Sequence, residues 1–153
     1  MTAAEPEAGA ETLFLDTSLI VAATVEVHPS HAAAAAFVDG AIAMDAKLHV
    51  SPQVCREFLV VLTRQPVSGR TFTLDEALAA LTVWTTGCSI LEESEAVLLE
   101  CLSLARRFGV HGKQIHDCNI VATMKVHGVR SLATRNPSDF KRFLDVIQVE
   151  AVS

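Results

Sequence analysis

The amino-acid sequence predicts an α/β domain with a central, mostly parallel sheet. Short apolar segments alternate along the chain with longer segments in which apolar residues recur at helical spacing. This alternation is typical of βα units, whose crossover helices place neighbouring strands parallel to one another. The chain has 153 residues, half of them apolar, which is enough for one hydrophobic core and no more than one domain. The sequence contains neither an internal repeat nor an interdomain linker.

Five short apolar runs are the candidate strands. Each is bounded by turn-forming or charged residues, as expected for strands that lie buried within a sheet. The predicted strands are Thr12–Asp16, Lys47–Val50, Cys88–Leu91, Ser131–Thr134 and Asp145–Val149.

Helices connect these strands, and several begin with recognisable signals. Ser51 is an N-cap residue followed by Pro52 at the first helical position, and Thr73 with Glu76 forms a capping box. Ser94 caps a further helix. The predicted helices are Thr17–Ala23, His31–Met44, Pro52 to about Arg64, one after Thr73 to about Thr86, one after Ser94 to Phe108, about Ile115 to Gly128, and a short helix from Pro137.

The ends and the cysteines suggest a cytoplasmic protein. Residues Met1–Glu11 are acidic, resemble no signal peptide and read as a frayed, disordered tail, so the single domain is expected over Thr12–Val149. No apolar run approaches the roughly 20 residues of a membrane helix, and we expect no membrane association. The four scattered cysteines fit free thiols in a reducing compartment better than a disulfide framework or a zinc site.

The formal net charge of −6 has two opposing implications. It argues against a protein that holds nucleic acid through overall basicity, because phosphate binding depends on Lys and Arg. It also leaves room for a local group of carboxylates, which a divalent metal site would require. Composition alone does not decide between these.

Two candidate acids follow predicted strands. Asp16 ends the first strand, and Asp139 follows the fourth after Asn136 and Pro137. In parallel sheets ligands gather beyond the carboxyl ends of the strands, so both acids are expected at the same edge. Each also has a structural explanation. Asp16 could cap the next helix, and Asn136 as N-cap with Asp139 in the first turn is a complete helix-start signal.

Two further acids lie on predicted helices. Glu57 falls on the shoulder of an apolar stripe, where a carboxylate needs either an ion-pair partner such as Arg64 or a metal. Asp117 lies in the middle of an apolar face that includes Ile120 and Val121. Its position in the first turn is electrostatically favourable for an ordinary N-terminal acid, but such a cap is not expected to point with apolar residues.

Taken together, the four acids predict a metal site. Two carboxylates about 4 Å apart repel by roughly 4 kcal/mol at an effective dielectric constant of 20, so a cluster must be protonated or neutralised. Oxygen ligands favour Mg²⁺, with Mn²⁺ as a possible substitute, over zinc. The candidate catalytic residues are Asp16, Glu57, Asp117 and Asp139.

Four segments resemble, in order, the motifs of PIN-domain ribonucleases of the VapC toxin family, which belong to type II toxin–antitoxin systems. The segments are Phe14–Ser18, Val54–Arg64, Ile115–Thr123 and Leu132–Phe140. The resemblance implies an α/β/α sandwich around a parallel sheet and a Mg²⁺-dependent endoribonuclease that cleaves RNA. It further implies a cognate antitoxin protein as partner and a homodimer.

By position, the resemblance makes Asp16 and Asp117 the principal metal ligands, with Glu57 ligating directly or through water. Many relatives carry two acids after the late strand, and the earlier of these is Asn136 here, which leaves Asp139 and puts a second metal in doubt. Hydroxyl groups are expected to orient a ligand or water, and basic side chains near the edge to hold phosphate. The candidate substrate-binding residues are Thr17, Arg64, Lys113, Thr134 and Asn136, with Arg70 as a further phosphate contact.

Other readings remain open or are weak. The main alternative is a catalytically silent PIN-like module that binds RNA or protein. A receiver-type phosphoacceptor domain fits poorly, because Asp16 has no acidic neighbour before it. His116 is expected on a polar face of its helix, pointing away from Asp117, and Trp84 in the core or a dimer interface.

Overall fold

A computed structural model describes residues 11–153 of the chain. The predicted disordered tail lies outside the described residues, apart from Glu11. The element order alternates strands with helices as the sequence predicts. The strands are β1 (Thr12–Leu15), β2 (Lys47–Val50), β3 (Ser89–Ile90), β4 (Ser131–Thr134) and β5 (Gln148–Ala151).

The helices begin close to the predicted positions because their start signals are local. Ser51 accepts a hydrogen bond from the Val54 N–H, and Thr73 and Glu76 form both bonds of the capping box. The helices are α1 (Thr17–Thr24), α2 (His31–Ala43), α3 (Pro52–Arg64), α4 (Leu74–Gly87), α5 (Glu95–Phe108) and α6 (Gln114–Val126), followed by the 3₁₀ helix η1 (Pro137–Phe143).

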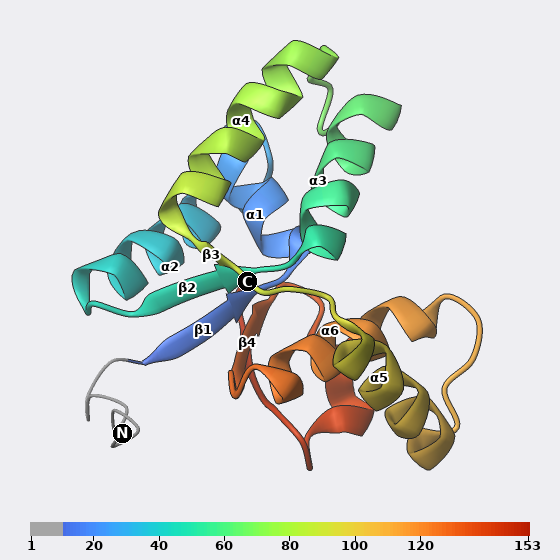
Figure 1. The fold of residues 1–153 in the computed structure, drawn as a ribbon. Coiled ribbons are helices and arrows are strands. Elements are labelled where there is room, and N and C mark those ends of the chain that lie inside the picture. Colours follow the sequence, from blue (N-terminus) through green and yellow to red (C-terminus); the bar gives the residue numbers. More distant parts are fainter. Residues whose placement is uncertain (1–10) are drawn as a thin grey trace.

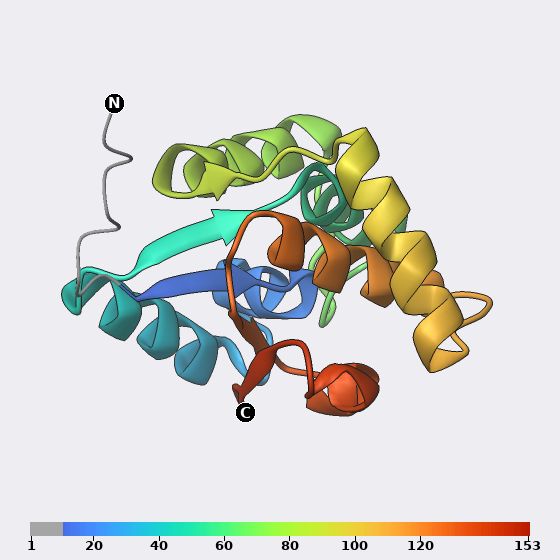
Figure 2. The same cartoon turned by 60° about the horizontal axis from the view of Figure 1, so that its bottom comes forward.

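The five strands form one sheet in the order β3-β2-β1-β4-β5, and every neighbouring pair is parallel. Helices flank this sheet on both sides, as Figures 1 and 2 show. The predicted α/β fold with a mostly parallel central sheet is therefore confirmed. Within residues 11–153, no helix is long and apolar enough to span a membrane.

The sheet and the helices bury a continuous apolar core. Phe14 and Leu15 of β1, and Leu132 of β4, have no exposed surface, and neither has Phe58 of α3. The half-buried Trp84 packs against this core and donates a hydrogen bond to Thr24 Oγ1 at 2.8 Å. Because β1 lies at the centre of the sheet, the residue that follows it is enclosed by elements on both sides.

Two predictions near the C-terminus are wrong in detail. The last strand is Gln148–Ala151 rather than Asp145–Val149, because the N–H groups of Val146 and Ile147 both bond to the Phe143 carbonyl and close a turn there. Asn136 makes no side-chain cap, and its own N–H donates to Thr134 Oγ1 at 3.0 Å.

The cysteines are free, as expected. Cys101 and Cys118 are buried, and Cys55 and Cys88 are half-buried. Burial raises the pKa of the Cys118 thiol to about 12 and that of Cys88 to about 11. Thiols with such high pKa values remain protonated and unreactive at neutral pH.

Candidate functional site

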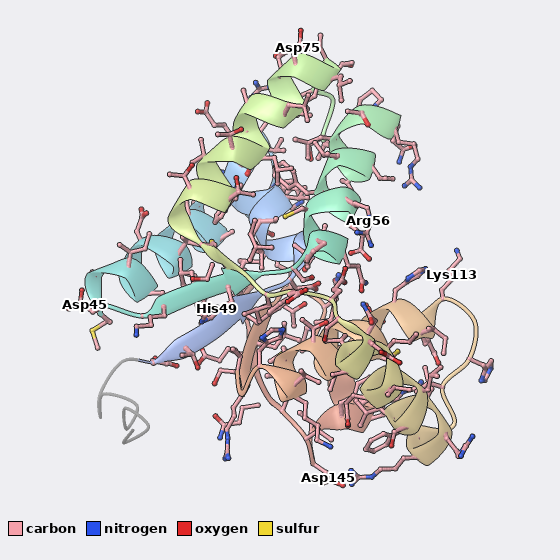
Figure 3. The ribbon with its side chains drawn as sticks, viewed as in Figure 1. Asp45, His49, Arg56, Asp75, Lys113 and Asp145 are labelled. Carbon is pink, nitrogen blue, oxygen red and sulfur yellow. The ribbon has the colours of Figure 1, made fainter. Side chains whose placement is uncertain are left out.

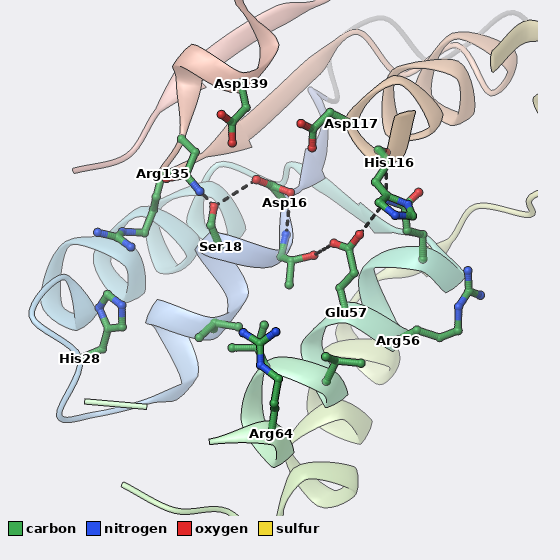
Figure 4. Close-up of a pocket in the computed structure, with 16 residues that line it drawn as sticks. Asp16, Ser18, His28, Arg56, Glu57, Arg64, His116, Asp117, Arg135 and Asp139 are labelled. Atoms are coloured by element: carbon green, nitrogen blue, oxygen red, sulfur yellow. Dashed lines mark hydrogen bonds between the residues drawn. The ribbon is translucent and has the colours of Figure 1, made fainter. Parts of the chain in front are cut away.

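A cavity of about 670 Å³ opens at the carboxyl ends of β1 and β4. Residues from α1, α3, α6 and the start of η1 surround it, so four segments far apart in the sequence meet there. Figure 4 shows that all four candidate acids face this pocket. They are Asp16, Glu57, Asp117 and Asp139.

Asp16 lies at the floor of the pocket. Its backbone N–H continues the pairing of β1 with β4 by donating to the Ala133 carbonyl, and its side chain caps α1 through the Thr17 N–H. The second carboxylate oxygen accepts from Thr134 Oγ1 at 2.7 Å and from Ser18 Oγ at 3.1 Å. Burial raises the pKa of Asp16, and these three hydrogen bonds oppose that rise.

Asp117 occupies the first turn of α6 and is half-buried. Its pKa is raised to about 7, first by burial and then by the negative charges of Asp139, Asp16 and Glu57. Arg142 opposes the rise. The other three acids of the pocket thus each disfavour the charged form of Asp117, as a nearby like charge does.

Glu57 projects from α3 toward the same pocket. Thr17 Oγ1 donates to its Oε2 at 2.7 Å, and Gln53 Nε2 donates to its Oε1 at 2.8 Å. Arg64, the alternative ion-pair partner, lines the pocket but forms no salt bridge with Glu57; among residues 11–153 the salt bridges are Arg56–Glu93 and Lys125–Glu100. Neutral donors therefore hold this carboxylate.

Asp139 and Asn136 belong to the turn that leads into η1. Both line the pocket and both are exposed. The Asp139 N–H bonds to the Asn136 carbonyl, which fixes the turn through the backbone. Its carboxylate acts on Asp117 as the largest of the charge effects that raise the pKa there.

The remaining predicted residues divide into two groups. Thr17 and Thr134 contact the carboxylates directly, and Arg64 lies along the pocket wall. Lys113 is exposed at the outer end of the connection that leads into α6 and does not line the pocket (Figure 3). Arg70 packs its guanidinium over the Phe72 ring at 4.3 Å, which occupies it away from the acids.

Sequence reasoning missed several residues of the pocket. Ser18 bonds to Asp16, and Gln53 bonds to Glu57 from one helical turn earlier. The i, i+4 spacing on α3 was a signal for the Gln53 contact. His116 was expected to point away from the acids, yet it also lines the pocket, where its backbone carbonyl accepts from Gln53.

The donor set fits a hard divalent cation. The four acids that face the pocket offer carboxylate oxygens, and a cation would relieve the charge repulsion at Asp117. Within residues 11–153, no three acidic, histidine or cysteine side chains already form a complete metal-binding group. Mg²⁺ does not require one, because it usually keeps several waters and takes only one or two carboxylates from the protein.

Comparisons with solved structures identify similar folds. The chain superposes on VapBC2 of Rickettsia felis, bound in its crystal to a promoter DNA fragment, with a TM-score of 0.66 and 16% identity over 93% of this chain and 99% of the other. VapBC-1 of nontypeable Haemophilus influenzae gives a TM-score of 0.67 and 16% identity, with 92% and 97% covered.

A third structure is VapC20 of Mycobacterium tuberculosis, described as a toxin that cleaves the sarcin–ricin loop. It gives a TM-score of 0.61 and 16% identity, with 78% of this chain and 86% of the other covered. No curated protein sequence shows significant similarity to the chain. The family model for the PIN domain matches residues 13–144. This match spans β1 to the end of η1 and includes all four acids of the pocket, and the chain belongs to the PIN domain family.

Proposed function

We propose that this protein is a Mg²⁺-dependent endoribonuclease and the toxin of a toxin–antitoxin pair. One observation carries the nuclease proposal: four carboxylates from four segments face one pocket, where burial, together with the charges of the other three acids, raises the pKa of Asp117 to about 7. A fold does not gather like charges in a cavity without a compensating partner, because each carboxylate destabilises the others.

Asp16 and Asp117 would hold the metal ion as principal ligands, with Glu57 contributing directly or through water. Mn²⁺ would substitute for Mg²⁺. A bound divalent ion lowers the pKa of its water and stabilises negative charge on a phosphate. Asp139, exposed at the rim, is the fourth catalytic candidate, and its carboxylate would add negative charge near the metal ion.

Hydroxyl groups and basic side chains complete the proposed site. Thr17 and Thr134 fix the orientation of Glu57 and Asp16 through bonds of 2.7 Å each. Arg64, together with Asn136 at the rim, would hold the RNA backbone, because a guanidinium pairs well with phosphate. Lys113, outside the pocket, would contact only a longer RNA.

The toxin part of the proposal comes from the structural relatives. Two of them are VapBC toxin–antitoxin proteins, and the third is a toxin described as cleaving an RNA loop. By likeness of fold, we infer that this chain pairs with a cognate antitoxin, forms a homodimer and acts in the cytoplasm. An antitoxin segment that carries basic residues would complement the acidic pocket.

Cleavage of RNA by the purified protein tests the nuclease. Freed of antitoxin, the wild-type protein should cut structured RNA in Mg²⁺ and stop when EDTA is added. Asp16→Ala and Asp117→Ala should abolish cleavage while keeping the circular-dichroism spectrum of the folded protein. If the wild-type protein binds a broad panel of transfer and ribosomal RNAs without cutting any, the silent binding module becomes the better assignment.

Growth of cells tests the toxin. Expression without antitoxin should arrest growth, and Asp16→Ala should relieve the arrest at an equal protein level. Equal growth of cells that express the wild-type and the Asp16→Ala protein would rule out the toxin assignment, even if RNA cleavage were seen in the test tube.

A further inference from the structure

Two side-chain amides, those of Gln53 and Asn119, extend a chain of hydrogen bonds from Glu57 Oε1, the carboxylate oxygen that Thr17 does not contact. Gln53 Nε2 donates to Glu57 Oε1 at 2.8 Å and to the His116 carbonyl at 2.9 Å. Asn119 Nδ2 donates to Gln53 Oε1 at 2.7 Å and to Glu93 Oε1 at 3.0 Å. The two amides thus form a continuous hydrogen-bonded chain between a pocket carboxylate and a carboxylate outside it.

The chemistry of the partners fixes the direction of this chain. Glu57 Oε1 and the His116 carbonyl can only accept, so the Gln53 NH₂ group must face them and its oxygen must face Asn119. The Asn119 NH₂ group then uses its two hydrogens on Gln53 and Glu93. Reversing either amide would bring acceptor against acceptor, which makes the arrangement unique.

The hydrogen bonds of the amide pair connect α3, α6 and the segment before α5. Gln53 is 5% exposed and belongs to α3, whereas Asn119 is half-buried and belongs to α6. Glu93 precedes α5. A buried amide whose hydrogen-bonding groups are all satisfied resists rearrangement, because each broken bond leaves an unpaired polar group away from water.

We propose that Gln53 and Asn119 are positioning residues, which hold the Glu57 carboxylate in the pocket beside Asp16 and Asp117. The inference rests on the proposed function, since Glu57 is assigned there to the metal site. Gln53 lines the pocket, but this role requires no contact of either residue with substrate. Gln53 acts on Glu57, and Asn119 acts on Gln53.

Positioning matters here because a glutamate side chain has three rotatable bonds. Thr17 holds one carboxylate oxygen of Glu57 from α1, and Gln53 holds the other from α3. With both oxygens held, the carboxylate has one orientation before the metal arrives. Removing a residue that orients a metal ligand typically lowers metal affinity or activity by 10–100-fold.

The test begins with Gln53→Met, which keeps the length of the side chain and removes its donors and its acceptor. A crystal structure of this variant should show the Glu57 carboxylate rotated from its wild-type orientation, because only Thr17 still holds it, and Mn²⁺ affinity measured by titration should fall by about 10–100-fold. The kcat should fall while the KM for RNA changes little. A Glu57 side chain that stays bonded to Thr17 in the same orientation would overturn the proposal.

A double-mutant cycle separates positioning from a general loss of stability. If Gln53 acts only through Glu57, adding Gln53→Met to the Glu57→Gln protein should not lower its kcat further. If the two substitutions instead lower kcat by independent, additive amounts, the proposal is contradicted. Thr24→Val is the matched control, since it removes the 2.8 Å bond from Trp84 far from the acids. It should lower the melting temperature without changing Mn²⁺ affinity or kcat.

Asn119→Ala provides a second variant if Gln53→Met fails to fold. It leaves the Gln53 donors in place but frees the oxygen of Gln53, so a smaller loss of Mn²⁺ affinity in the same direction is expected. Unchanged affinity and an unchanged Glu57 orientation in Asn119→Ala would remove Asn119 from the proposal. A wild-type protein that never cleaves RNA would overturn the proposed function instead, while the orientation of Glu57 in the crystal structures would still decide the positioning role.

Discussion

At the scale of single residues, the charge of Asp117 is the feature most sensitive to a bound metal. Burial disfavours the charged form of Asp117 most, and the negative charges of Asp139, Asp16 and Glu57 disfavour it further. Asp117→Asn should therefore raise the melting temperature of the protein in EDTA and reduce the further rise that Mg²⁺ produces. A ligand that binds only the folded state stabilises it, by about 2.7 kcal/mol at a hundredfold excess over its dissociation constant.

Asp39→Asn, on the exposed surface of α2, is the matched control for this charge change. It should leave the melting temperature in EDTA and the melting temperature in Mg²⁺ as they are in the wild type. If Asp117→Asn keeps the full response to Mg²⁺ in differential scanning fluorimetry, Asp117 is not a ligand of the metal.

His49 on β2 makes the stability of the fold depend on pH. Both of its ring nitrogens are shielded from solvent and have no hydrogen-bond partner within residues 11–153. Burial lowers the pKa of His49, and the positive charges of His127 and Lys47 lower it further. The unfolded chain, with a histidine pKa of about 6.5, then binds the proton more readily than the folded protein does.

The sign follows from this difference in proton binding. The free energy of unfolding is unaffected by His49 above about pH 6.5. It decreases as the pH falls from there through the lower pKa that His49 has in the folded state. His49→Phe should flatten the decrease in urea-unfolding free energy between pH 7 and pH 5. His111→Asn, at an exposed position, should not. A wild-type curve that rises toward pH 5 over the same range, with His49→Phe following it, would contradict this account.

The sequence indicated the four acids but not what holds them. Asp16 and Asp117 could be placed because strand ends and helix faces follow from spacing alone. The partners of Glu57 could not, because the approach of α1 and α6 to α3 depends on how the whole core packs. The choice between Arg64 and neutral donors was decided by that packing.

At the scale of elements, local start signals account for most of the agreement between sequence and structure. The start signals at Ser51, Thr73 and Ser94 each precede a helix within one residue of the predicted start. The prediction placed the last strand too early because Val146 and Ile147 are apolar and β-branched, as strand residues often are. In the structure their N–H groups bond to the Phe143 carbonyl, so both residues belong to a turn.

The N-cap of α3 should matter for the site as well as for stability. Ser51 is fully buried and accepts from the Val54 N–H, and Gln53 and Glu57 lie in the first two turns of the helix that it starts. Ser51→Ala should cost about 1 kcal/mol of unfolding free energy and should also weaken Mn²⁺ binding. Fraying of the first turn would loosen Gln53.

Thr73→Ala removes the equivalent cap of α4, whose start lies away from the pocket. It should lower the melting temperature and leave Mn²⁺ affinity unchanged. If both cap variants weaken Mn²⁺ binding to the same extent, the effect reflects global stability rather than the start of α3, and calorimetric titration of the two proteins side by side distinguishes these outcomes.

At the scale of the whole molecule, the net charge of −6 limits how RNA can be bound. Overall charge repels a polyanion, so attraction must come from the few basic side chains around the pocket, which are Arg56, Arg64 and Arg135. Arg56 is 3.8 Å from Glu93, and Arg135 donates to Ser30, so neither is fully available. Binding should therefore be weak and should involve few phosphates.

The salt dependence of the RNA-binding constant measures the number of phosphates that the protein neutralises. For single-stranded RNA the slope of log K against log salt is about −0.7 per phosphate neutralised, so full use of the three arginines would give a slope near −2, and partial use of Arg56 and Arg135 a shallower one. Fluorescence anisotropy with the Asp16→Ala protein in EDTA would measure binding without cleavage. Arg64→Gln should make the slope less steep by about 0.7, whereas Arg130→Gln, an exposed change outside the pocket, should leave it unchanged. Equal effects of the two substitutions would mean that RNA responds to the total charge of the protein rather than to the pocket.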